Sequence, residues 1–182
     1  MSSKSSEAPA ARYAVLLRGV NVGGINVKMA DLRRVLEAAG LTDVRTVLAS
    51  GNVLVTSELP PRRLRPQIEA VLREAFGYEA WVQVLPLERI AAIVADFPFD
   101  TDEATHHPYV MFCADDGALA DVGALAAEID PDVEKVRPGE GVIYWEAPKG
   151  SSTDTTFAKL TSRARYRSVL TTRNLRTLRK LI

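Results

Sequence analysis

The sequence predicts an α+β protein made of two tandem ferredoxin-like split β-α-β units, βαββαβ and then βαββα, with connecting and C-terminal helices. Short runs of β-branched and aromatic residues alternate with amphipathic segments at helical spacing, which predicts mixed strands and helices. The chain has 182 residues, of which 47% are hydrophobic, so it can bury a core without disulfides. Its single cysteine, Cys113, excludes an intrachain disulfide.

The first unit is predicted from six segments in β-α-β-β-α-β order. A tight turn at Ser50-Gly51-Asn52 separates two short apolar runs, and Gly and Asn both tolerate the positive φ of a hairpin turn. Glycines end both helices, at Gly40 and Gly77. The predicted strands are residues 13–20, 44–48, 53–56 and 81–85, and the predicted helices contain Met29–Ala39 and Leu64–Phe76.

The second unit repeats this order except at its end. A helix near Leu87 connects the units, and a Pro/Gly turn at 138–141 joins two strands into a hairpin. The other predicted segments are a strand at 109–114, a helix through Leu119 and Ile129, strands at 133–137 and 142–147, a helix near Thr153, and a closing helix at 172–181. We therefore expect a disordered tail at 1–11, a first subdomain at 12–86 and a second at 87–182.

Charge is distributed unevenly although the formal net charge is zero. Residues 1–86 carry +3, residues 87–148 carry −11 and residues 149–182 carry +8, so a globally basic nucleic-acid binder is excluded. The acidic middle and basic end can attract each other, or the basic end can meet an anionic partner. No apolar stretch approaches the length of a membrane span, and no signal sequence is recognisable, so we expect a cytoplasmic protein without a membrane partner.

The segment from Arg18 to Lys28 is the most unusual in the chain. It lies between a strand and a helix, where free N–H groups and glycines allow an anion to approach the backbone. It fits neither a Walker A loop nor a dinucleotide fingerprint, and its glycines also suit simple turns. As an anion site it would offer Arg18, Asn21, Gly23, Gly24 and Lys28.

Two further polar segments compete with ordinary structural roles. Ser50-Gly51-Asn52 is expected at the opposite end of the sheet from the Arg18–Lys28 segment, so the two need not share a pocket. Arg173 and Asn174, in the predicted closing helix, are candidate ligand contacts, although hydroxyl and Asn side chains at helix starts are routine caps.

Several chemistries are not expected. His106 and His107 are adjacent and would point to opposite faces of a strand, so we predict no metal site and no cofactor. Cys113 lies in an apolar strand and should be an inert thiol. No acid/base pair or nucleophile emerges from the spacing. The first unit lacks an aromatic platform and the second is strongly acidic, so sequence-specific nucleic-acid binding is not expected.

Three motifs resemble one bacterial family. The run Leu17-Arg-Gly-Val-Asn-Val-Gly-Gly24, the turn Ser50-Gly51-Asn52 and the later Thr171-Thr-Arg-Asn174 together resemble the domain of unknown function 1697 family over residues 12–181. The resemblance implies an α+β fold of two related halves and no established reaction, substrate or cofactor. The chain differs in having Leu175 where the family often shows Trp.

These observations favour a binding protein for a small anionic, phosphate-bearing ligand. An enzyme acting on such a ligand and a protein-interaction or self-association module stay open as alternatives. The identity of the ligand and the oligomeric state are not set by the sequence.

Overall fold

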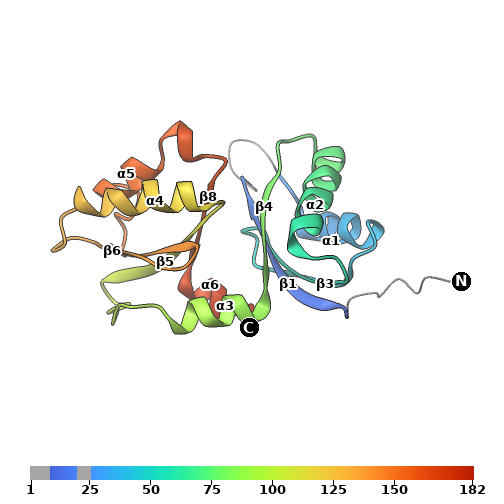
Figure 1. The fold of residues 1–182 in the computed structure, drawn as a ribbon, viewed down its shortest axis with the longest axis horizontal. Helices are drawn as coiled ribbons and strands as arrows, with labels where there is room; N and C mark the ends of the chain where they lie inside the picture. The colour runs from blue at the N-terminus through green and yellow to red at the C-terminus, as the bar shows by residue number, and fades with distance from the viewer. Residues whose placement is uncertain (1–8, 20–25) are drawn as a thin grey trace, which may run out of the picture. The chain divides into compact units, whose positions relative to one another are not determined.

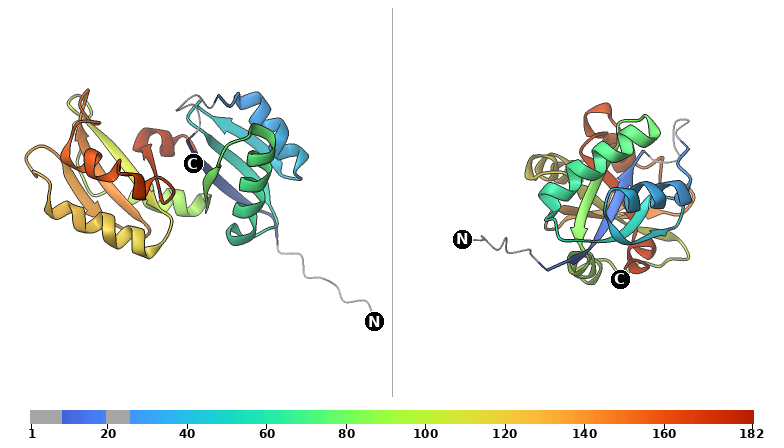
Figure 2. Two further views of the ribbon diagram at one scale, coloured as in Figure 1. Left: turned by 90° about the horizontal axis from the view of Figure 1, so that it is seen from above. Right: turned by 90° about the vertical axis from the view of Figure 1, so that its right-hand side faces the viewer.

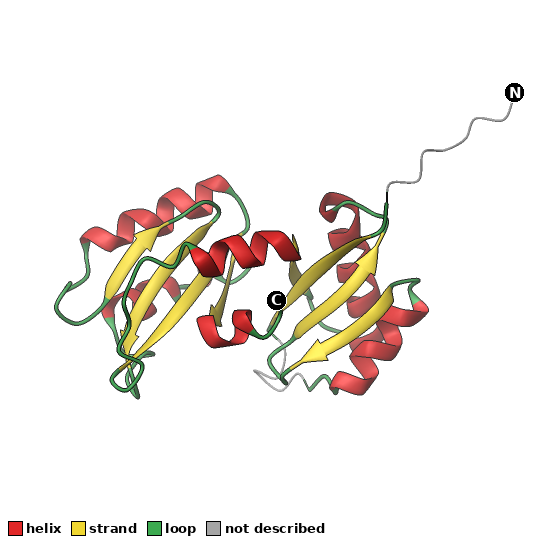
Figure 3. Ribbon diagram, turned by 90° about the horizontal axis from the view of Figure 1, so that it is seen from below, coloured by secondary structure: helices red, strands yellow, loops and turns green. Residues whose placement is uncertain are grey.

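The computed structural model describes residues 9–19 and 26–182. They fall into two compact units: unit 1 comprises the residues up to Ile90, and unit 2 comprises Ala91–Lys180. Each unit contains one four-stranded antiparallel sheet together with helices, so the fold is mixed α+β (Figure 1). Figure 3 shows strands and helices as separate layers in each unit.

Unit 1 has the element order β-α-β-β-α-β. Its sheet order is β2-β3-β1-β4, with every neighbouring pair antiparallel. Helices α1 and α2 cover one face of this sheet (Figures 1 and 2), and the core between them includes Val15, Leu32 and Ile68. The elements are β1 (Ala11–Arg18), α1 (Met29–Ala38), β2 (Thr42–Val47), β3 (Asn52–Ser57), α2 (Pro61–Phe76) and β4 (Trp81–Pro86), followed by α3 (Leu87–Ala95).

Local sequence explains where the longest helix begins and ends. Pro61 occupies the first helical position of α2, where its missing N–H costs no hydrogen bond. Leu64, Ile68 and Leu72 recur every four residues and are buried against the sheet. Gly77 then ends the helix with a φ of 65°, a left-handed conformation that glycine adopts without steric cost.

Unit 2 has the same element order and sheet order, β6-β7-β5-β8. All its strand pairs are antiparallel, and its core is built around Phe157, Ile143 and Trp145. The elements are β5 (His106–Cys113), α4 (Asp116–Ala124), the 3₁₀ helix η1 (Leu125–Ala127), β6 (Lys135–Pro138), β7 (Val142–Pro148), α5 (Thr156–Thr161), the 3₁₀ helix η2 (Ala164–Tyr166), β8 (Leu170–Asn174) and α6 (Leu175–Arg179).

The end of unit 2 corrects the sequence-based expectation. A closing helix at 172–181 and a βαββα order are wrong, because Leu170–Asn174 form β8 and pair with β5. Helical spacing of leucines begins only at Leu175, after Asn174 caps α6 by accepting a hydrogen bond from the Arg176 amide at 2.9 Å. The β-branched Thr171 and Thr172 favour the strand that precedes this cap.

Several other boundaries differ by a few residues, among them those of the first strand, Ala11–Arg18, and of the helix expected to reach Ile129, which ends at Ala124. The helix expected near Thr153 begins at Thr156, because Thr155 supplies the cap by accepting a hydrogen bond from the Ala158 amide at 3.2 Å. Strand β5 begins at His106 rather than Tyr109. No helix in the described part of the chain is both long and apolar enough to cross a membrane.

Candidate functional site

The β2–β3 turn lies at the end of the unit-1 sheet where β1 finishes. The Leu17 amide donates a hydrogen bond to the Gly51 carbonyl at 2.7 Å, and Leu16 pairs with Asn52. The expectation that this turn lies at the opposite end of the sheet is wrong. Strand β3 is antiparallel to both β1 and β2, so β1 and β2 run in the same direction and finish at the same end.

The turn itself is held by side-chain hydrogen bonds. Gly51 has a φ of 73°, which favours glycine. Asn52 is fully buried, and its Nδ2 donates to the Val47 carbonyl at 3.0 Å and to Ser50 Oγ at 2.9 Å. Asn52 therefore serves the turn and does not reach toward solvent.

Helix α1 begins at this same end. Lys28 is its extended N-cap residue, and no described side chain caps the helix. The Lys28 carbonyl accepts hydrogen bonds from the amides of Asp31 and Leu32, both at 3.0 Å. The Lys28 side chain is exposed and forms no ion pair with the described residues. An uncapped helix N-terminus beside a lysine attracts anions through both the helix dipole and the ammonium charge.

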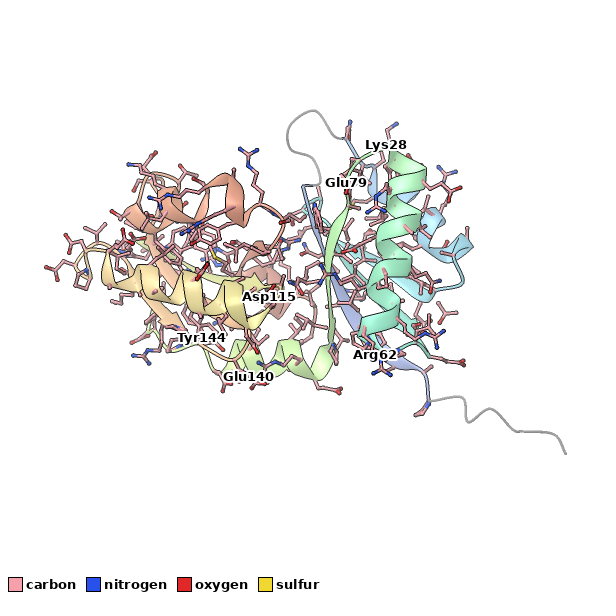
Figure 4. The ribbon with its side chains drawn as sticks, turned by 45° about the horizontal axis from the view of Figure 1, so that its top comes forward. Lys28, Arg62, Glu79, Asp115, Glu140 and Tyr144 are labelled. Carbon is pink, nitrogen blue, oxygen red and sulfur yellow. The ribbon has the colours of Figure 1, made fainter. Side chains whose placement is uncertain are left out.

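The α2–β4 connection reaches the same end and carries a buried hydroxyl. Figure 4 shows Glu79 of this connection and Lys28 toward one end of unit 1, with Arg62 at the other. Tyr78 is 8% exposed, and within the described part of the chain its hydroxyl has no hydrogen-bond partner. Burial raises the pKa of this phenol, so it is a neutral donor. A buried hydroxyl without a partner costs about 1–3 kcal/mol.

Arg18 lies at the end of β1, directly across from Trp81 on β4. Leu17 belongs to the core beneath the helices. Successive side chains on a strand alternate, so Arg18 leaves the sheet on the face opposite to α1 and α2. Arg18 and Lys28 therefore share an end of unit 1 without sharing a face. The other candidates from this segment, Asn21, Gly23 and Gly24, lie outside the described residues.

Arg173 and Asn174 belong to unit 2 and lie on β8 rather than in a closing helix. Arg173 is buried, and its Nη1 donates to Thr171 Oγ1 and to the Thr172 carbonyl, both at 2.9 Å. Burial lowers the pKa of its guanidinium to about 10. Asn174 uses its side chain as the cap of α6. Both side chains have structural roles within unit 2.

The two units differ most where the first strand meets the first helix. The Cys113 amide donates to the Gly141 carbonyl at 3.2 Å, which is the unit-2 equivalent of the Leu17–Gly51 bond. In unit 1 residues 19–28 connect β1 to α1, whereas in unit 2 only residues 114 and 115 connect β5 to α4. Asp115 caps the N-terminus of α4 by accepting a hydrogen bond from the Ala118 amide at 2.8 Å. The two units thus share one sheet topology but differ in the connection between the first strand and the first helix.

The described residues hold no cluster of His, Cys, Asp and Glu that could bind a metal ion. Cys113 is buried, and this burial, together with the nearby Asp115 carboxylate, raises the pKa of its thiol to about 12. Such a thiol is almost entirely protonated at neutral pH and is a poor nucleophile.

Sequence reasoning missed Tyr78. Its position between the glycine that ends α2 and the first residues of β4 suits any connection, and no residue pattern separates a buried hydroxyl without a partner from a bonded one. Only the packing reveals it, because the ring belongs to the same core cluster as Val27 and Leu17.

Comparisons with known proteins agree with this architecture. A family model described as "Protein of unknown function (DUF1697)" matches residues 10–144. A solved structure, conserved bacterial protein SP0830 from Streptococcus pneumoniae, is 28% identical and has a TM-score of 0.79, with 94% of this chain and 96% of that chain covered. No curated protein matches the chain.

Proposed function

Because the chain belongs to the DUF1697 family, whose description names no ligand or reaction, we propose from its structure that unit 1 binds a small anionic, phosphate-bearing ligand where β1 leads into α1. The observation that carries this proposal is the difference between the two units at equivalent positions. Asp115 caps the first helix of unit 2 with its carboxylate, whereas no side chain among residues 9–19 and 26–182 caps the start of α1 at Lys28.

The groups at this end suit a phosphate better than a carboxylate-rich macromolecule. A helix N-terminus offers several converging N–H donors, and phosphate has enough oxygens to accept from them and from an ammonium at once. Lys28 supplies the charge, and the neutral hydroxyl of Tyr78, in the connection that reaches the same end, is a candidate further donor. Asn21, Gly23 and Gly24 in the β1–α1 connection stay candidate contacts, and Arg18 is a candidate from the opposite sheet face.

Isothermal titration against inorganic phosphate, nucleotides and sugar phosphates tests the proposal. At least one of these anions should bind. Lys28→Gln should lower the affinity for that anion about tenfold through the loss of one charged hydrogen bond. Arg62→Gln is the matched control, since it removes one exposed cation from the other end of the same unit. The proposal fails if no anion in the panel binds, or if the two variants bind equally well.

The architecture supports two finer proposals. We propose that both units are ferredoxin-like, because each has the element order β-α-β-β-α-β with its first strand central and its second and fourth strands at the edges. We also propose a cytoplasmic location, to which a single buried thiol is suited because it needs no oxidising compartment.

A further inference from the structure

Unit 2 carries a dense set of cations at the end of α5 and in the connection from α5 to β8. We define the cationic loop as residues 159–169, which include the exposed side chains of Lys159, Arg163, Arg165 and Arg167. This segment contains no Asp or Glu. The connection between α5 and β8 covers residues 162–169, whereas its equivalent in unit 1, residues 77–80, is shorter, and Glu79 there pairs with Arg73 at 3.4 Å.

The backbone of the cationic loop is anchored to the core of unit 2 by a buried tyrosine and by hydrogen bonds. Tyr166 is 2% exposed and belongs to the unit-2 core. The guanidinium carbon of Arg165 lies 4.5 Å from the centroid of the Tyr166 ring. Backbone hydrogen bonds from Tyr166 to the Arg163 carbonyl, at 3.0 Å, and from Ala114 to the Val169 carbonyl, at 2.9 Å, close the turn and tie it to the end of β5. Little backbone conformational entropy would therefore be lost when this loop meets a partner.

The charges of the cationic loop are not compensated within the described residues. None of its four cations forms an ion pair there, whereas Arg176 and Arg179 on the following helix share the Glu103 carboxylate. Like charges held close together repel each other, and an external anion relieves this repulsion. The loop is therefore suited to a partner that presents several negative charges in a row.

The side chains of the loop select the kind of polyanion. A protein partner is normally anchored by exposed apolar or aromatic groups, and the large hydrophobic residues of this segment, Leu160 and Tyr166, are buried. Because Tyr166 is covered, it cannot stack on a base either. Guanidinium groups bind phosphate oxygens in a bidentate manner. We propose that the cationic loop binds the phosphate backbone of nucleic acid without reading its sequence.

Fluorescence anisotropy of the full chain with two labelled single-stranded oligonucleotides of unrelated sequence tests this proposal over a salt series. Both should bind with equal affinity, which should fall as salt rises. The triple variant Arg163→Gln, Arg165→Gln, Arg167→Gln should lose about tenfold or more in affinity, and its salt slope should fall by about 2, as expected for three lost phosphate contacts. Arg165 also packs on Tyr166, so the double variant Arg163→Gln, Arg167→Gln, with an expected fall of about 1.4, separates charge from folding.

The matched control is the triple variant Arg33→Gln, Arg34→Gln, Arg73→Gln, which removes the same charge from arginines that already have carboxylate partners. It should bind almost as well as the unaltered chain. The proposal is overturned if the unaltered chain binds neither oligonucleotide, or if the control loses as much affinity as the loop variants. Equal competition by poly-glutamate, or tighter binding of inorganic polyphosphate than of either oligonucleotide, would also overturn it.

Discussion

The buried carboxylate of Glu134 accepts a hydrogen bond from the indole Nε1 of Trp145 at 2.9 Å. Its other oxygen accepts from the amide of Phe157, also at 2.9 Å. One side chain thus joins the segment before β6 to the middle of β7 and to the first turn of α5. The negative charge also faces the N-terminus of that helix, where the dipole favours it.

Replacing Glu134 should destabilise unit 2 strongly. Glu134→Ala leaves two buried donors without acceptors and should lower the free energy of unfolding by about 2–4 kcal/mol, measured by urea denaturation with tryptophan fluorescence. Glu134→Gln keeps one acceptor and should lose roughly half as much. Glu128→Ala, at an exposed position, is the control and should change stability by less than about 0.5 kcal/mol. A small loss for Glu134→Ala would contradict this account.

Removing the Tyr78 hydroxyl should have the opposite sign in the ligand-free protein. Because the hydroxyl is buried and has no hydrogen-bond partner among the described residues, Tyr78→Phe should leave the free energy of unfolding unchanged or raise it by up to about 1 kcal/mol. The hydroxyl of Tyr166 accepts a hydrogen bond from Arg165 Nη2 at 2.5 Å, so Tyr166→Phe should lower the free energy of unfolding relative to the unaltered chain. Chemical denaturation compares the two. Tyr78→Phe should also lower the affinity for any anion that binds at Lys28. An unchanged affinity would show that Tyr78 is not part of the site.

The ionisation of Glu146 should make the free energy of unfolding depend on pH in the acid range. Burial opposes ionisation, but hydrogen bonds from Lys135 at 2.8 Å and Thr101 at 2.5 Å outweigh it, so the pKa of Glu146 lies below its ordinary value of 4.5. The carboxylate therefore stabilises the folded state fully above pH 4.5, and this contribution is lost as the pH falls through the lower folded-state value.

A comparison with Glu146→Gln measures this contribution. The stability gap between the unaltered chain and the variant should be largest near neutral pH and should shrink as the pH falls below 4.5. Lys135→Met removes one of the two donors and should shift the shrinkage to higher pH. A gap that stays constant across the acid range would show that the two hydrogen bonds do not favour the ionised form.

The thiol of Cys113 should be unreactive until the protein unfolds. With a pKa of about 12, only about one thiol in ten thousand is ionised at pH 8, and burial blocks access as well. Modification by a thiol reagent should therefore be at least about a hundred times slower in the native protein than in urea. Rapid reaction of the native protein would mean that β5 opens locally without global unfolding.

The sequence predicted unit 1 more completely than unit 2. Gly77 ends α2 as expected, whereas Ala39 rather than Gly40 is the C-cap residue of α1, and Gly40 follows it with a φ of 88°. The turn that contains Ser50 and Gly51 joins β2 to β3, which begins at Asn52. In unit 2 the strand Leu170–Asn174 was hidden, because the leucine spacing that follows it reads as one longer helix. Pairing with β5 decides this segment, and such long-range pairing leaves no local trace.

The candidate site shows a similar division. Lys28 was identifiable because it closes an unusual strand-to-helix segment, whereas Tyr78 was not, since its importance depends on a missing hydrogen bond. The wrong placement of the Gly51 turn was an error of topology. Two strands joined by a crossover helix in one sheet run in the same direction, so the predicted order already placed the end of the second strand beside the end of the first. The pairing of β3 with both β1 and β2 confirms this.

The contrast between the ten-residue and two-residue strand-to-helix connections has a consequence for how such proteins can diversify. Closing a loop five times longer costs only about 1.4 kcal/mol of chain entropy, because this cost grows with the logarithm of length. Insertions at residues 19–28 should therefore lower the free energy of unfolding only slightly. The hydrogen bond between Leu17 and Gly51, which joins β1 to the β2–β3 turn, does not depend on the length of this connection. Relatives with the same two-unit frame can acquire new recognition properties by changing this one connection, without redesign of either core.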